Sequence, residues 1–145
     1  MAITSAICSS FKQELLQGKH SFESSGGHTF KIALFDSDAN LGASTTGYST
    51  SEEITNTSGT AYTSGGATLT SVTPVASSTT AVCDFADVSY TSASFTANGA
   101  LIYNSSDSNA AVCAIAFGSD KTATNGTFTI QFPTADATNA IIRLA

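Results

Sequence analysis

Two histidines, His20 and His28, are the residues of this chain best suited to proton transfer, and they flank a short Ser/Gly turn. An imidazole placed beside a carboxylate and a serine could form an acyl-transfer triad. The many serines of the chain lack the strand–turn–helix context in which a Gly-x-Ser-x-Gly sequence presents a nucleophile. We therefore expect structural or solvent-exposed histidines and no catalytic residue.

Acidic residues recur at close spacing in two places. The segment Asp36–Asn40 (DSDAN) begins like a calcium-binding loop, because alternate oxygen ligands can converge on one hard cation. Such a loop needs glycine at its sixth position and glutamate at its twelfth, where this chain has Leu41 and Gly47. Asp84 and Asp87 could pair as glycosidase carboxylates. Turn capping is the simpler interpretation of both groups, so we predict neither a metal nor a cofactor.

The three cysteines, Cys8, Cys83 and Cys113, are widely spaced and include no Cys-x-x-Cys pair. The odd number and the wide spacing favour buried free thiols. A single disulfide between Cys83 and Cys113 and a reactive thiol are the alternatives.

The composition is that of one globular β-rich domain. The chain has 145 residues and is 41% apolar, which is enough for a core of useful size. Charged residues make up 11%, against roughly 25% in an average soluble protein. Serine and threonine replace them at roughly 30% of the chain, and both suit exposed strand faces and loops. Such a composition is typical of secreted and virion-surface β proteins.

The charge pattern excludes some partners. The net charge is −6, and the five basic residues are scattered, so we expect no nucleic-acid partner. No apolar run approaches the roughly 18 residues that a membrane span requires. The N-terminus lacks the positive region of a signal peptide, so we expect synthesis in a cytoplasm and no membrane partner.

The N-terminal segment has a helical pattern. Four apolar residues recur there every four positions: Ile3, Ile7, Phe11 and Leu15. Thr4 or Ser5 could cap the start of a helix, and Gly18 stands where a glycine would end it. We predict a helix over residues 5–17, within a helical arm formed by residues 1–20. Its apolar stripe either packs on the sheet of its own domain or contacts a neighbouring subunit.

The remainder of the chain reads as short strands separated by turns. Residues 127–132 show the pattern most clearly, because Phe128, Ile130 and Phe132 alternate with polar residues. The strands that we predict cover residues 28–35, 67–73, 81–85, 88–96, 100–104, 111–117, 127–132 and 139–144. This spacing favours a mainly β fold, an antiparallel β-sandwich or jelly roll with a short N-terminal α-helix. Residues 21–145 are expected to form this single domain.

Two further regions are candidates for contact with a partner. A long loop is expected at 36–66, and loops of this length are usually functional, which directs attention to Tyr48 and Tyr62. Near the C-terminus, Ile142 and Leu144 lie on a predicted strand that either belongs to the core or exchanges with a neighbour. The candidate partner contacts are therefore Ile3, Ile7, Phe11, Leu15, Tyr48, Tyr62, Ile142 and Leu144.

Six blocks of sequence carry a resemblance to a known family. They are residues 1–16 (MAITSAICSSFKQELL), 29–34 (TFKIAL), 62–66 (YTSGG), 99–104 (GALIYN), 126–130 (GTFTI) and 139–143 (NAIIR). Together they span nearly the whole chain in order. On these blocks the chain resembles a family of small virion structural proteins of tailed bacteriophages, common in phages of cyanobacteria and marine bacteria.

The resemblance implies a non-enzymatic role, most simply that of a capsid decoration (cement) protein that binds and stabilises the phage head. Its implied location is the virion, and its implied partners are the major capsid protein or other virion proteins. Homo-oligomers, dimers or trimers on local symmetry axes, are usual for such proteins. The alternatives are a neck or tail component, and a receptor- or glycan-binding module with several exposed tyrosines side by side.

Overall fold

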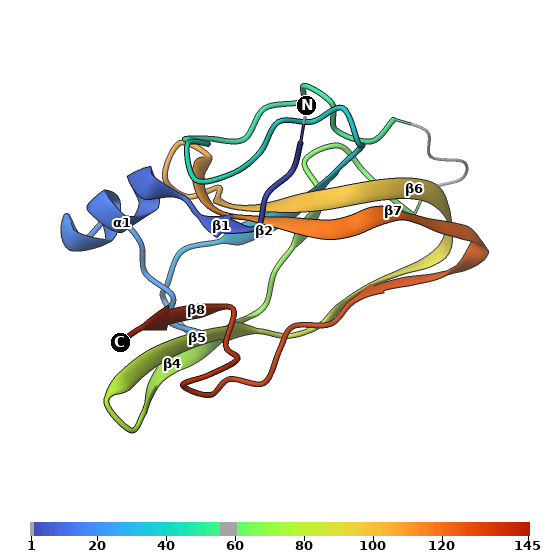
Figure 1. Ribbon diagram of the computed structural model, residues 1–145. Helices are drawn as coiled ribbons and strands as arrows, with labels where there is room; N and C mark the ends of the chain where they lie inside the picture. Colours follow the sequence, from blue (N-terminus) through green and yellow to red (C-terminus); the bar gives the residue numbers. More distant parts are fainter. Residues whose placement is uncertain (1, 56–60) are drawn as a thin grey trace.

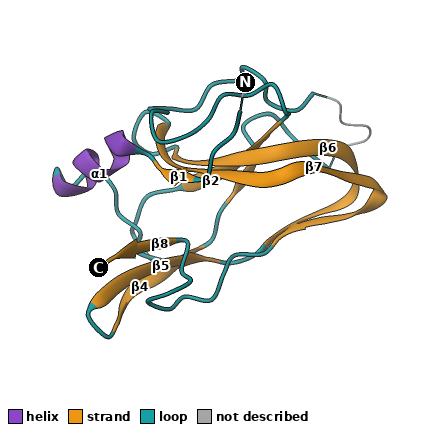
Figure 2. Ribbon diagram, viewed as in Figure 1, coloured by secondary structure: helices purple, strands orange, loops and turns teal. Residues whose placement is uncertain are grey.

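The computed structural model describes residues 2–55 and 61–145, and most of its regular structure is β-strand (Figure 2). The elements in chain order are β1 (Ala6–Ile7), α1 (Ser9–Leu16), β2 (Phe30–Phe35), β3 (Ala67–Thr68), β4 (Ser71–Ser77), β5 (Thr80–Phe85), β6 (Val88–Asn104), β7 (Ala110–Ile130) and β8 (Ile142–Leu144). Within the described ranges, no helix has the length and apolar character needed to cross a membrane.

The strands form two antiparallel sheets, which confirms the predicted mainly β sandwich with one short helix. One sheet has five strands in the order β1-β7-β6-β2-β3, and the other has three in the order β4-β5-β8. β6 and β7 bend together at the end of the molecule away from α1, and from this bend the two layers diverge toward the end that carries α1 (Figure 1). The C-terminal strand β8 therefore belongs to the smaller sheet, while the N-terminal strand β1 belongs to the larger one.

The predicted strands between residues 88 and 132 prove to be only two. The turn-forming sequences inside them are absorbed as irregularities in the β6–β7 ladder, including shifts between Tyr90 and Ala93 and between Ala97 and Gly99. Gly118 and Asn125 adopt positive φ angles of 83° and 47° within β7. Bulges of this kind bend a strand without ending it, so the separate strands predicted here were wrong.

The N-terminal prediction also needs correction. The helix covers Ser9–Leu16 instead of residues 5–17, because Ala6 and Ile7 pair with Ala114 and Cys113 of β7. Cys8, and neither Thr4 nor Ser5, occupies the N-cap, without a side-chain hydrogen bond. The end is as predicted: Gly18 has a φ of 73°, the conformation of a glycine that follows a helix.

The abundance of serine and threonine is explained by the exposed face of the β6–β7 hairpin. Hydroxyl groups face each other across the two strands there, with Oγ–Oγ distances of 2.8 Å for Thr96–Thr122 and 3.1 Å for Ser89–Thr129. Such cross-strand pairs stabilise a sheet while leaving its outer face polar.

Aromatic side chains join the two sheets near α1. Phe22 stacks on Phe30 of β2 with ring centroids 4.3 Å apart, and Phe30 contacts Phe85 of β5 at 6.0 Å. Phe85 in turn contacts Phe132 at 5.6 Å. Phe30 and Phe85 are at most 1% exposed, so this chain of rings forms the core between the sheets.

Candidate binding groove

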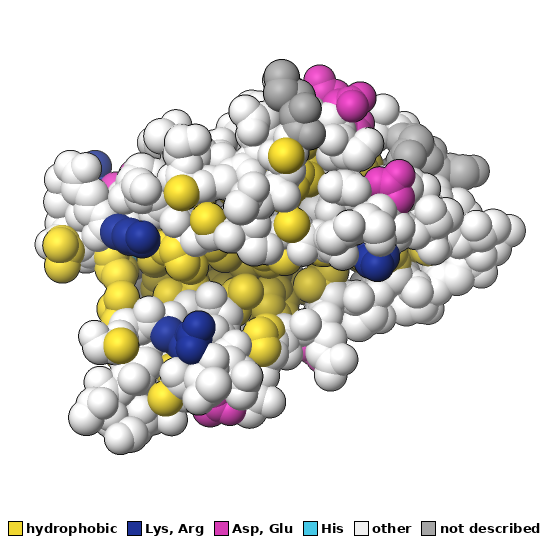
Figure 3. Space-filling view, in the orientation of Figure 1, with side chains coloured by type: hydrophobic (Ala, Val, Ile, Leu, Met, Phe, Trp, Pro, Cys, Tyr) yellow, Lys and Arg dark blue, Asp and Glu magenta, His cyan; other side chains and the backbone are white. Residues whose placement is uncertain are grey.

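Apolar side chains gather in a hollow that separates the two sheets on one face of the molecule (Figure 3). Beside α1 the hollow includes a cavity of about 310 Å³. Helix α1, β5 and β8 contribute most of its apolar lining, and Pro74 of β4 and Phe22 complete it; the residues from α1, β5 and β8 are Phe11, Leu15, Ala81, Cys83, Ile142 and Leu144. Leu144 is 54% exposed, which is unusual for a leucine that stands beside a core strand.

The hollow continues along β7. A second cavity of about 710 Å³ is lined there by apolar side chains of β7 and the segment that follows it: Ile115, Phe117, Phe128, Ile130, Phe132 and Ile141. Figure 3 shows apolar side chains continuing through the hollow between the two sheets, so we describe the two cavities together as one surface, which we call the groove. Contiguous exposed apolar surface on a soluble protein usually marks a place where a partner binds.

Two strand edges that border the groove have no further strand beside them in the described part of the chain. β8 pairs only with β5, through Ala81, Val82 and Cys83. β7 pairs with β6 along its length; on its other side β1 pairs with Cys113 and Ala114 and Gly47 bridges Ala110, while no strand pairs with the outer edge of β7 beyond Ala116 in the described residues. A free edge offers backbone N–H and C=O groups to an added strand.

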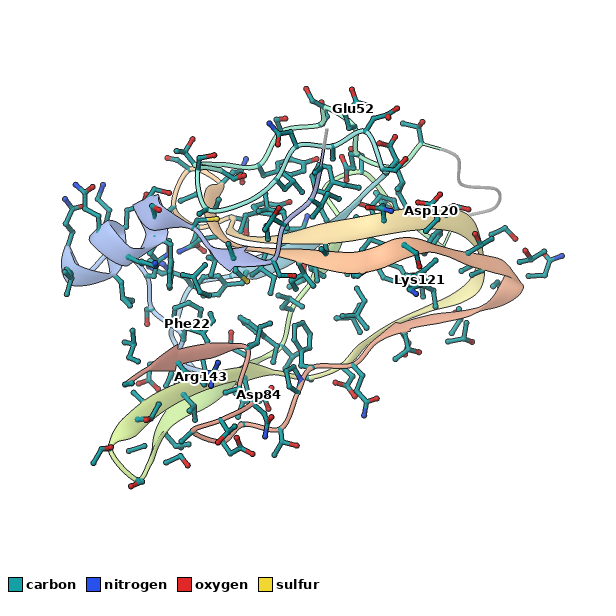
Figure 4. The ribbon with its side chains drawn as sticks, viewed as in Figure 1. Phe22, Glu52, Asp84, Asp120, Lys121 and Arg143 are labelled. Atoms are coloured by element: carbon teal, nitrogen blue, oxygen red, sulfur yellow. The ribbon has the colours of Figure 1, made fainter. Side chains whose placement is uncertain are left out.

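The groove also carries positive charge, although the protein is acidic. Lys121 of β7 lines the second cavity, and Arg143 stands in β8 between two residues that line the first. Figure 4 labels both side chains, and Figure 3 shows basic side chains beside the apolar hollow. Lys121 donates to Ser119 Oγ at 3.1 Å, and Arg143 donates to the carbonyl oxygens of Ala137 and Thr138. Neither cation forms an ion pair within the described residues.

The structure brings together half of the partner contacts predicted from the sequence. Phe11, Leu15, Ile142 and Leu144 come from opposite ends of the chain and line the same cavity. Ile3 and Ile7 lie in the extended segment before α1 and pack partly buried against the core.

Tyr48 and Tyr62 bind a buried carboxylate instead of lining the groove. Glu53 is 4% exposed and accepts hydrogen bonds from Tyr48 Oη at 2.7 Å and Tyr62 Oη at 2.5 Å. Ser64 Oγ at 2.9 Å and the backbone N–H of Gly65 at 2.7 Å complete its shell. Four donors satisfy this buried carboxylate and thereby tie together the two described parts of the 36–66 loop, residues 36–55 and 61–66. The remaining residues of that predicted loop, 56–60, lie outside the described residues.

Burial of these phenols predicts alkaline unfolding. Burial raises the pKa of Tyr90 and of Tyr103 from 10.0 to about 12, and it raises the pKa of Tyr62 further. Phenols of the unfolded chain ionise at their ordinary pKa, so the stability present below pH 10.0 is lost as the pH rises toward about 12. Far-ultraviolet circular dichroism and phenolate absorbance should therefore change together in this range. Independent ionisation of all four tyrosines near pH 10.0, with the fold intact, would contradict this prediction.

The two histidines meet at one asparagine. The amide of Asn104, which is fully buried, donates to Nδ1 of His20 and to Nδ1 of His28, both at 2.9 Å. His20 therefore carries its proton on Nε2 and donates it to Glu14 Oε2 at 2.8 Å. In the described ranges no serine or cysteine side chain bonds to either imidazole, so this network connects α1, the turn after it and the end of β6 without a nucleophile.

Among the residues that the structure describes, possible cation ligands lie within 4.8 Å of one another in two places, formed by Glu14, His20 and Asp107 and by Asp36, Asp38 and Glu52. A local hydrogen bond supports the turn-capping interpretation for Asp36, whose Oδ1 accepts the N–H of Asp38 at 2.9 Å. Asp87 forms a long-range contact instead of a turn cap, because its Oδ1 accepts the N–H of Phe132 at 2.8 Å.

All three cysteines are free thiols, as predicted. Because Cys83 lines the groove, its labelling rate measures how accessible the groove is to a reagent. Burial raises the pKa of Cys83 to about 11 and that of Cys113 to about 12. Because the thiolate is the nucleophile, iodoacetamide should label the partly exposed Cys83 slowly, with a rate that rises about tenfold per pH unit. Cys8 and Cys113 are buried and should react only on unfolding, which mass spectrometry of the labelled peptides can check. Faster labelling of Cys113 than of Cys83 would contradict this order.

Sequence reasoning missed several residues of the groove and the whole environment of Glu53. The alternation of Phe128, Ile130 and Phe132 indicated an apolar strand face, but not that the face remains partly open. Glu53 carried no local signal, because most of its donors lie nine to twelve residues further along the chain.

Comparison with known proteins found no match: no family model, no curated protein and no solved structure is similar to this chain.

Proposed function

We propose that this chain is a non-enzymatic structural protein of a phage virion, most simply a capsid decoration protein that binds the phage head and stabilises it. The observation that supports the proposal most directly is the groove itself, a contiguous apolar surface between two sheets with free strand edges beside it. The family resemblance of the six sequence blocks is its second support.

The rest of the molecule suits a static role. A decoration protein must persist as a rigid module, and the two-sheet fold with its buried aromatic core provides rigidity. The imidazoles and the most deeply buried carboxylate have hydrogen-bond partners within the fold. A negative net charge suits an outer capsid surface, because it maintains solubility and discourages stray contact with DNA.

A glycan-binding module has less support from the described residues. Such a module needs aromatic faces exposed side by side for stacking on sugars. Tyr62, Tyr90 and Tyr103 are 7%, 6% and 2% exposed, and Tyr48 stacks on Tyr103 with ring centroids 4.5 Å apart. These tyrosine rings therefore pack against other parts of the protein instead of forming a row of exposed faces.

The test is co-sedimentation of the purified protein with expanded shells, tails and host cells of its phage, combined with its mass in free solution. We expect saturable, stoichiometric binding to expanded shells and none to tails or cells. Binding to tails or cells in place of shells would overturn the head assignment, and tail binding would support a neck or tail component.

A further inference from the structure

The groove has backbone groups available along its border as well as apolar surface. β8 is the last strand of the β4-β5-β8 sheet, and only its β5 side is paired among the described residues. In β8, Ile142 (3% exposed) and Leu144 (54% exposed) lie two residues apart on one face of the strand and both line the groove, while Arg143 between them belongs to the other face. A strand added to this edge would extend the sheet and place every second side chain against the apolar lining.

The basic side chains beside the groove favour a bound segment that carries negative charge. Arg143 and Lys121 are two of only five basic residues in a chain of net charge −6, and neither has an ion-pair partner in the described ranges. Two acidic side chains also line the groove: Asp120, which accepts a hydrogen bond from Asn98 Nδ2 at 2.8 Å, and Glu23, beside α1. An occupant with carboxylates near Arg143 and Lys121 would therefore gain charge complementarity.

The same charges disfavour a second copy as the occupant. A two-fold contact of groove against groove would bring Arg143 and Lys121 of one copy toward the same residues of the other, and like charges in an interface are costly. A head-to-tail contact does not bring these like charges together and can close into a ring, so the crosslinking experiment below treats a second copy as the competing occupant. The charges favour a different polypeptide over a two-fold dimer of this chain.

We propose that the groove binds an extended segment of another virion protein, which pairs with the free edge of β8, inserts alternate apolar side chains and presents carboxylates to Arg143 and Lys121. This inference rests on the proposed function, because it names the form in which the shell protein engages the groove.

The first experiment measures binding of groove variants to purified expanded shells. Leu144→Asp places a charge on the apolar lining, and Arg143→Glu combined with Lys121→Glu reverses the charge beside it. Val75→Asp and Lys12→Glu are matched controls, because Val75 is 57% exposed on β4 and neither residue lines the groove. We expect the groove variants to lose at least tenfold in affinity and the controls to stay within twofold of the original protein. Circular dichroism and thermal melting must show that all variants are folded.

The outcomes separate this inference from the function on which it rests. If the original protein fails to bind shells, the proposed function fails. If it binds and the groove variants bind equally well, the protein decorates shells through another surface and the groove inference is wrong.

A second experiment tests the form of the occupant. p-Benzoylphenylalanine at position 144 should crosslink, in the shell complex, to one segment of one shell protein with alternating apolar residues and nearby acids. The same probe at position 75 should not. Hydrogen exchange of the β8 amides should slow in the complex, because a paired strand protects them. Crosslinks to a second copy of this chain, or unchanged exchange in β8, would overturn the proposal.

Discussion

Glu53→Ala is expected to lower the free energy of unfolding by about 3–5 kcal/mol, because it leaves several buried donors without an acceptor. The carboxylate accepts from Tyr62 Oη and from the Gly65 N–H inside the protein, and from Tyr48 and Ser64 nearer to solvent. Removing one partner of such a network costs the desolvation of every group left unpaired. Urea unfolding followed by circular dichroism gives the change.

The neighbouring residue provides the control for Glu53. Glu52 is exposed and has no hydrogen bond through its side chain in the described part of the chain, so Glu52→Ala should change stability by at most about 0.5 kcal/mol. Glu53→Gln keeps the shape but turns one acceptor into a donor, so its cost should lie between the two. Equal effects of the alanine variants at 52 and 53 would refute the structural importance of the Glu53 shell.

Gly66→Ala should destabilise the protein by about 3 kcal/mol or more, because overpacking and backbone strain combine at this position. Gly66 has a φ of 81°, and a Cβ there would lie 1.8 Å from the carbonyl oxygen of Ile32 and 2.8 Å from Cα of Ala33. Both atoms belong to the backbone of β2, which is held between β3 and β6 and cannot move aside without breaking its ladder. The melting temperature should fall by about 10 °C.

A comparison of Gly118→Ala with Gly66→Ala separates the effect of the steric clash from the effect of backbone strain. Gly118 has nearly the same φ, 83°, but a Cβ there would meet no atom within 4 Å. It should therefore cost only the about 1–2 kcal/mol of a left-handed conformation. If both substitutions cost the same, the close approach of Gly66 to β2 is not a determinant of stability.

Local patterns in the sequence determined the fold class and some element ends. Period-two alternation, as in residues 127–132, predicted strands, and Gly18 marked the end of the helix, because each depends on residues close together in the chain. Prediction from local patterns failed where hydrogen bonds between distant strands determined the local structure. Ala6 and Ile7 fit a helical stripe, yet hydrogen bonds to β7, more than a hundred residues later, hold them extended. Gly118 and Asn125 read as turns, but the long ladder with β6 keeps them inside one strand.

For the candidate site too, the sequence indicated the individual residues, and the tertiary structure determined how they lie together. From the sequence alone, Phe11 and Leu15 were apolar residues of a helix, and Ile142 and Leu144 were apolar residues of a strand. Only the tertiary structure placed them in one groove, left the β8 edge free beside it and surrounded Glu53 with donors. Burial and strand pairing join residues that are distant in the chain, and their free energy depends on the whole packed arrangement, which no local pattern encodes.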